Sequence, residues 1–142
     1  MALWCVHSKG INLRLWRTGS YKFRVVEASN REPGDLLTNY DYILFPRKYE
    51  GALRTTGAQL QLTPVTVTDE VRKLVWHHYL EATIKHDITS EEISRGSQVG
   101  PAIFRYGDQD PSVFVSDALR ATLQQVQGQS LLFSAGLSLF GG

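Results

Sequence analysis

The chain has 142 residues, of which 42% are apolar, 11% aromatic and 20% charged, with a formal net charge of +1 at pH 7. This length and composition favour one globular domain with its own core and exclude a disordered chain. Fifteen Lys and Arg against 14 Asp and Glu give no overall field for nucleic acid or an anionic membrane. The single cysteine excludes an internal disulfide and a Cys-rich zinc module, so we expect the cytoplasm or a viral particle as the location.

Neither a secretory signal nor a membrane span is expected. The apolar run at the start covers only residues 2–6. A spanning helix needs about 18 consecutive apolar residues, and no stretch of the chain approaches that length. We therefore expect no membrane as a partner.

The first half of the chain has the pattern of β-strands. Residues 11–27 alternate apolar and polar side chains on both sides of Thr18-Gly19-Ser20, which predicts a β-hairpin. The apolar positions of this hairpin are Leu13, Leu15, Tyr21, Phe23 and Val25. Residues 28–40 have the composition of a loop, with one helical turn expected at 35–37. Two further strands are predicted at 41–45 and 60–68, the second with Pro64 at an edge or a bulge.

A main amphipathic helix is predicted at residues 69–85. Thr68 can cap its first turn, acidic residues follow directly, and Lys85 stands near its end. On a helix, one apolar face would bury in the core, and Trp76 and Leu80 would form a second apolar stripe. Either the rest of the domain or a partner subunit could cover that stripe.

The second half mixes helices and strands. The sequence Thr89-Ser90-Glu91-Glu92 has capping-box spacing and predicts a short helix that ends near Gly96. Residues 101–106 and 112–116 predict a second hairpin, and Ser116 can cap a last helix that ends at Gly128. The apolar, glycine-containing residues 130–142 favour a docking arm over a regular helix. We thus divide the chain into a domain at 1–129 and an arm at 130–142.

No local motif indicates catalysis, a metal or a cofactor. On the predicted helix, His77 and Glu81 would lie one turn apart, which is ligand spacing, but a plain polar contact is the preferred interpretation because no further ligands are indicated. Cys5 is interpreted as a small buried side chain. No nucleophile elbow or phosphate-binding glycine motif is present in the sequence. We therefore expect a non-enzymatic protein with no catalytic residues, no metal site and no cofactor.

The near-neutral charge hides an asymmetry between the two halves. Residues 1–60 hold nine basic and five acidic residues, a net +4, and residues 61–142 hold six and nine, a net −3. Basic residues beside an aromatic ring are what phosphate contact and base stacking require. In the hairpin at 11–27 those candidates are Arg14, Trp16, Arg17, Lys22 and Arg24. The same pattern also fits an ordinary half-exposed hairpin.

The sequence as a whole predicts an α+β fold: a small antiparallel β-sheet or partial barrel, one main amphipathic helix, two shorter helical segments and an apolar C-terminal arm. The leading hypothesis is an assembly subunit, of a viral particle or another complex, whose partners are copies of itself or other subunits. The candidate partner-binding residues are Trp76, Leu80, Leu131, Leu132, Phe133, Leu137, Leu139 and Phe140. The alternative hypothesis is nucleic-acid binding through the hairpin at 11–27.

Overall fold

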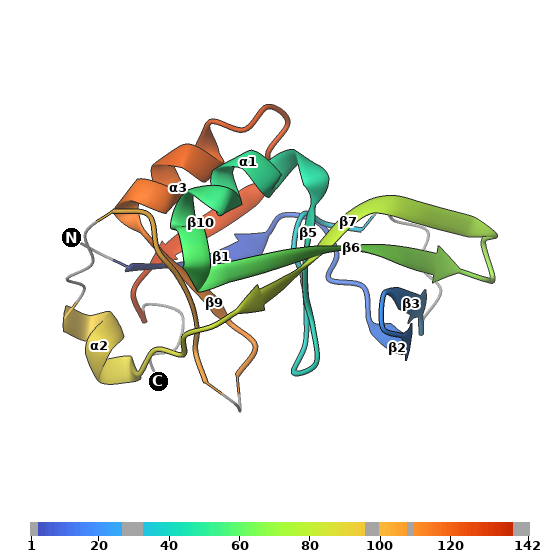
Figure 1. Ribbon diagram of the computed structural model, residues 1–142, viewed down its shortest axis with the longest axis horizontal. Coiled ribbons are helices and arrows are strands. Elements are labelled where there is room, and N and C mark those ends of the chain that lie inside the picture. Colours follow the sequence, from blue (N-terminus) through green and yellow to red (C-terminus); the bar gives the residue numbers. More distant parts are fainter. Residues whose placement is uncertain (1–2, 27–32, 96–99, 108–109, 138–142) are drawn as a thin grey trace.

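The computed structural model describes residues 3–26, 33–95, 100–107 and 110–137 and contains two β-sheets with helices packed beside them (Figure 1). The fold is mostly β, with 46% of it in strands and 22% helical. This contradicts the predicted α+β class with a main amphipathic helix. Figure 1 shows a body with α1 and α3 above β1, β9 and β10, from which the long β6–β7 hairpin projects beyond β2 and β3.

The first sheet has four strands in the order β10-β1-β9-β8, and all neighbours are antiparallel. Its strands are β1 (Leu3–Ser8), β8 (Ile103–Arg105), β9 (Val113–Ser116) and β10 (Leu131–Ala135). The predicted second hairpin is confirmed as β8 and β9. Residues 131–135 of the predicted arm form the edge strand β10, which pairs with β1 at the opposite end of the chain. Docking of the arm on a neighbour stays a prediction.

The second sheet has six strands in the order β2-β3-β6-β7-β5-β4 and curls into a half-barrel. Its strands are β2 (Leu15–Gly19), β3 (Lys22–Val25), β4 (Leu37–Thr38), β5 (Ile43–Pro46), β6 (Leu60–Asp69) and β7 (Leu74–Ile84). The β3–β6 pair is parallel and the other pairs are antiparallel. The predicted hairpin at 11–27 is confirmed as β2 and β3, although Tyr21 is 60% exposed instead of buried.

Three helical regions complete the described fold. A helical stretch that is absent from the prediction contains η1 (Arg47–Tyr49), α1 (Glu50–Leu53) and η2 (Arg54–Gln59), and it is kinked at Gly57, whose φ is 65°. The short helix α2 (Ser90–Arg95) follows a capping box in which Thr89 and Glu92 exchange hydrogen bonds, as predicted. Ser116 caps α3 (Asp117–Gln124), also as predicted, but this helix ends four residues before Gly128.

The buried apolar residues of the described segments form three clusters. The largest lies between the four-stranded sheet and the helices α1 and α3, and includes Val6, Leu53, Leu119 and Leu131. The second fills the half-barrel around Phe23, and the third lies on the other face of the four-stranded sheet, against α2. Sheet faces that are apolar on both sides explain why β1 and β9 do not alternate cleanly between apolar and polar residues.

The predicted main helix at 69–85 is wrong, because these residues form the end of β6, a turn and the strand β7. Asp69 is buried and accepts a hydrogen bond from the backbone amide of Arg72, and Lys73 has a φ of 56°, so the chain reverses there. Val67 of β6 pairs with Trp76 of β7, and Val65 pairs with Tyr79. Between these two pairs β7 therefore has one residue more than β6, which makes a β-bulge. The extra residue breaks the period-two pattern and produces the apparent helical spacing.

In the first half of the chain, Leu37 begins β4, so the helical turn expected at 35–37 is wrong. Pro64 lies beside the β-bulge of β6, where β3 does not yet pair with that strand, as its missing N–H requires.

Candidate functional site

The outward face of the β2–β3 hairpin carries the predicted basic and aromatic residues together. Trp16 pairs directly with Arg24 across the two strands, and alternation puts Arg14 and Lys22 on the same face. The buried positions between them, Leu15 and Phe23 among others, point into the half-barrel. We call the four residues Arg14, Trp16, Lys22 and Arg24 the basic aromatic face.

This face continues across the neighbouring strands as a polar surface. Lys22 pairs with Thr66 of β6 and Arg24 pairs with Thr68, so these side chains form cross-strand rows. Trp16 is 64% exposed and Val75, opposite Thr68 on β7, is 52% exposed. Both side chains are therefore accessible to a partner on this face.

The charge of Arg24 on the basic aromatic face is compensated only weakly. Arg24 approaches Glu70 with 3.9 Å between Nη1 and Oε2, and both side chains are about half exposed or more. Exposed pairs at that distance contribute about 0–1 kcal/mol and are easily displaced. A hollow beside Lys22 is also lined by Tyr21, Arg47 and His77, so Arg47 is a further cation near this face.

Arg17 is separated from the basic aromatic face by its contacts. Its guanidinium forms a bidentate pair with Glu81 of β7, with Nη2–Oε2 at 2.7 Å, and Nε lies 3.0 Å from Asp41 Oδ2. It also lies over the Phe23 ring, 4.7 Å from the centroid. The hydrogen bonds that Arg17 donates to Glu81 are the main reason that the pKa of Arg17 is raised. Arg17 therefore ties β2 to β7 and the β4–β5 turn and is not available to a phosphate.

Most of the residues predicted to bind a partner are used inside this chain. Leu80 is 1% exposed and Leu131 is 3% exposed. Trp76 packs against the half-barrel core, so the proposed second helix stripe does not exist. Phe133 and Leu137 pack against the other two clusters. Leu132, at 47% exposed, points away from the core, and Leu139 and Phe140 lie outside the described residues.

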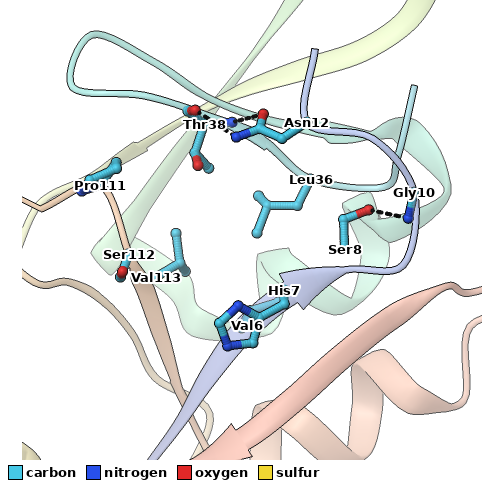
Figure 2. A pocket seen from close by; sticks show the side chains of 10 residues that line it. All are labelled: Val6, His7, Ser8, Gly10, Asn12, Leu36, Thr38, Pro111, Ser112 and Val113. Atoms are coloured by element: carbon cyan, nitrogen blue, oxygen red, sulfur yellow. Dashed lines mark hydrogen bonds between the residues drawn. The ribbon is translucent and has the colours of Figure 1, made fainter. Parts of the chain in front are cut away.

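A small hollow of about 260 Å³ lies where the two sheets meet (Figure 2). Its lining comes from β1, the segment after it, Leu36 and Thr38 on either side of Leu37 in β4, and the start of β9, and holds no acidic or basic side chain apart from His7. His7 contacts Ser134, and burial lowers its pKa, which favours the neutral ring. The polar groups of Ser8 and Asn12 already bond within the chain, so the hollow offers little to orient a ligand.

A buried polar network beside this hollow ties three parts of the chain together. Asp35 accepts hydrogen bonds from the Tyr49 hydroxyl and from the Ser130 amide at 3.0 Å, and pairs with Lys48 at 2.9 Å. Burial alone would raise the pKa of Asp35, but these hydrogen bonds outweigh it and hold the pKa below its ordinary value. Burial and the bond to Asp35 raise the pKa of Tyr49. The side chains of this network bond to one another and to the backbone, so we interpret the network as a contribution to the stability of the fold.

The expected polar contact between His77 and Glu81 is absent from the structure. On a strand these residues do not share a helical turn, and Glu81 instead pairs with Arg17. Within the described ranges no group of three or more His, Cys, Asp or Glu side chains could hold a metal ion. Cys5 is 1% exposed, as predicted, and burial is the main reason that its pKa rises to about 11.

Among the helices in the described segments, none is long and apolar enough to cross a membrane.

Sequence reasoning missed the residues that face Trp16 across the gap between β2 and β4. These are Asn39 and Tyr40, and Tyr40 is 68% exposed. They lie in a short turn with no periodicity, and only the curl of the sheet brings them near the first hairpin. The available signal was compositional: an Asn-Tyr-Asp-Tyr sequence between two short strands.

No protein-family model, curated protein or solved structure matches this chain.

Proposed function

We propose that this protein binds single-stranded nucleic acid through the basic aromatic face. The observation that supports this is the common exposed face of Arg14, Trp16, Lys22 and Arg24 on one hairpin of a curled β-sheet. Proteins that hold single strands combine cations that follow the phosphates with aromatic rings on which bases stack. Both elements are present within two adjacent strands.

The distribution of charge fits this proposal better than the total does. The chain as a whole carries +1, yet the first 60 residues carry a net +4. The acidic partners Asp41 and Glu81 near the hairpin are already occupied by Arg17, and Asp69 is buried at 2% exposure. Because one guanidinium faces two carboxylates there, the positive charge offered to a ligand comes from the basic aromatic face itself.

Fluorescence anisotropy with a labelled single-stranded oligonucleotide tests the proposal. The triple variant Arg14→Ala, Lys22→Ala, Arg24→Ala should lose binding at low salt. A matched control changes three exposed cations on other elements, Arg54→Ala, Lys85→Ala and Arg95→Ala, and removes the same charge. Equal loss in both triple variants would show that only net charge matters and would overturn the assignment to this face.

An assembly role is the second candidate, supported by one observation on β10. This strand ends the four-stranded sheet and has the sequence LLFSA, with no charge or proline to discourage pairing with another strand. Its partners would be copies of this chain or other subunits, in the cytoplasm or within a viral particle. The exposed Leu132 then lies at the contact.

The native mass of the purified protein tests this second candidate. Deletion of the arm is a poor test, because it would remove Leu131 from the core. The change Leu132→Glu affects an exposed side chain and should reduce an oligomer to a monomer, whereas Val71→Glu, at a 77% exposed position on the β6–β7 turn, should not. A wild-type monomer at all concentrations would exclude self-assembly.

A further inference from the structure

The two edges of the half-barrel approach each other along a gap that side chains close at both ends. At one end, the Asn12 side chain exchanges two hydrogen bonds with the backbone of Thr38, at 3.0 and 3.1 Å. At the other end, Arg17 bonds to the side chain and the carbonyl of Asp41. We call the space between these two ties, bounded by residues 12–17 and 38–42, the seam.

The seam is hollow and has exposed aromatic walls. Two adjoining hollows of about 340 Å³ each share Leu15, Trp16 and Asn39 in their linings. Trp16 borders both of them, and Tyr40 borders one. These two rings are among the most exposed large apolar side chains described, at 64% and 68%.

Polar groups along the seam are oriented by the fold. The Asn39 side-chain oxygen accepts bonds from the amides of Asp41 and Tyr42, which fixes the side chain and leaves its amino group as a donor. Arg14 borders the same hollow as Tyr40, and Arg24 lies opposite Trp16 on β3. A flat ring that entered here would find stacking surface, one amide donor and two nearby cations.

We propose that the seam binds an unpaired nucleobase, stacked on Trp16 and flanked by Tyr40, with the adjoining phosphates on Arg14 and Arg24. This inference rests on the proposed function and adds the place where one base is held, because a base inside a duplex cannot enter the seam. Aromatic stacking tolerates any base sequence, so a non-specific single strand is the ligand.

A peptide strand added to the edge of β2 fits the seam less well. The backbone amide of Leu15 already donates to the Tyr42 hydroxyl at 2.9 Å, so a donor that an added strand would use is occupied. The ties at Asn12 and Arg17 also leave only four residues between them, about 13 Å of strand at 3.3 Å per residue. A single base needs far less length than a paired peptide.

Tryptophan fluorescence of the full chain tests the proposal with two probes: a short oligothymidine and the same backbone with abasic sites. The oligothymidine should quench the emission of the exposed Trp16, and the abasic strand should not. Trp16→Phe should abolish the quenching, whereas Trp76→Phe removes a half-buried ring and should preserve it. Because stacking stabilises by about 1–3 kcal/mol per base, Trp16→Ala should weaken oligothymidine binding at least about fivefold.

The outcomes separate the two proposals. If both strands bind equally and without quenching, but the triple variant of Arg14, Lys22 and Arg24 loses binding, the seam proposal is overturned and the proposed function stands. If neither strand binds, both are overturned. Quenching of Trp16 by an uncharged extended peptide with equal or higher affinity would overturn the nucleobase assignment in favour of a peptide site. Loss of oligothymidine binding in Tyr40→Ala, with unchanged binding of the abasic strand, supports the seam as the base site.

Discussion

The change Asp35→Asn tests whether the buried network around Tyr49 holds the two sheets together. Asparagine keeps the size of the side chain and an acceptor oxygen but removes the charge. Two hydrogen bonds, from the Tyr49 hydroxyl and the Ser130 amide, then change from charged to neutral. A bond to a charged group contributes about 1.5–3 kcal/mol and a neutral one about 0.5–1.5 kcal/mol. We add little for Lys48, because its side chain is 35% exposed and water screens the pair.

The expected loss is therefore about 2 kcal/mol in the free energy of unfolding at pH 7, measured by urea denaturation. The folded state holds the pKa of Asp35 below its ordinary value, so the stabilisation is present above about pH 4 and is lost as pH falls through the folded pKa. The difference between wild type and Asp35→Asn should thus shrink below about pH 4.

Asp87→Asn is the matched control, because Asp87 is an exposed acid whose carboxylate lies 3.6 Å from Arg105. Its cost should stay below about 0.5 kcal/mol. A loss in Asp35→Asn no larger than in this control, or a difference that does not change with pH, would refute the reasoning.

Two further predictions concern packing and burial. Gly34→Ala should destabilise the protein by about 1–3 kcal/mol, because the new Cβ would lie 2.1 Å from Ser8 Oγ and 3.0 Å from the Gly10 backbone. The control Gly51→Ala in α1 places a Cβ with nothing within 4 Å and should be neutral or slightly stabilising. Thermal melts of the two variants test this, and equal melting temperatures would contradict it. Cys5, with a pKa of about 11 and 1% exposure, should react with a thiol reagent at pH 8 only after denaturation, and rapid reaction of the native protein would show that its strand opens locally.

Local patterns in the sequence predicted the elements that depend on local residues. The β2–β3 hairpin has uninterrupted alternation on both sides of its turn, and the capped helices after Thr89 and Ser116 follow side chains that accept hydrogen bonds from nearby amides. Each of these signals is contained within a few residues. The predicted strands at 41–45 and 60–68 likewise correspond to β5 and β6, with shifts of one or two residues.

The errors arise where pairing is long-range or irregular. The bulge opposite Val65 and Val67 gave β7 a helical period, although its Val, Trp, Tyr and Thr content favours a strand. β10 was not predicted as a strand because its partner, β1, is more than 120 residues away in the sequence. Only this pairing explains how the apolar Leu131 is buried.

Only part of the candidate site was predicted, because the rest depends on long-range contacts. Alternation alone grouped Arg14, Trp16, Lys22 and Arg24 on one face. It could not separate Arg17, because the ion pair that occupies Arg17 comes from Glu81 on a strand that the sequence indicated as a helix. Tyr40 and Asn39 join the site only through the curl of the sheet.

The salt dependence of single-strand binding by the intact protein tests the central claim most directly. Three cations on the phosphates predict a slope of about −2 for the logarithm of the association constant against the logarithm of salt concentration, or about a 20-fold loss between 50 and 200 mM. The triple variant Arg14→Ala, Lys22→Ala, Arg24→Ala should show no measurable binding. Absence of binding by the wild type at 50 mM salt, or the same slope in the triple variant, would contradict the account.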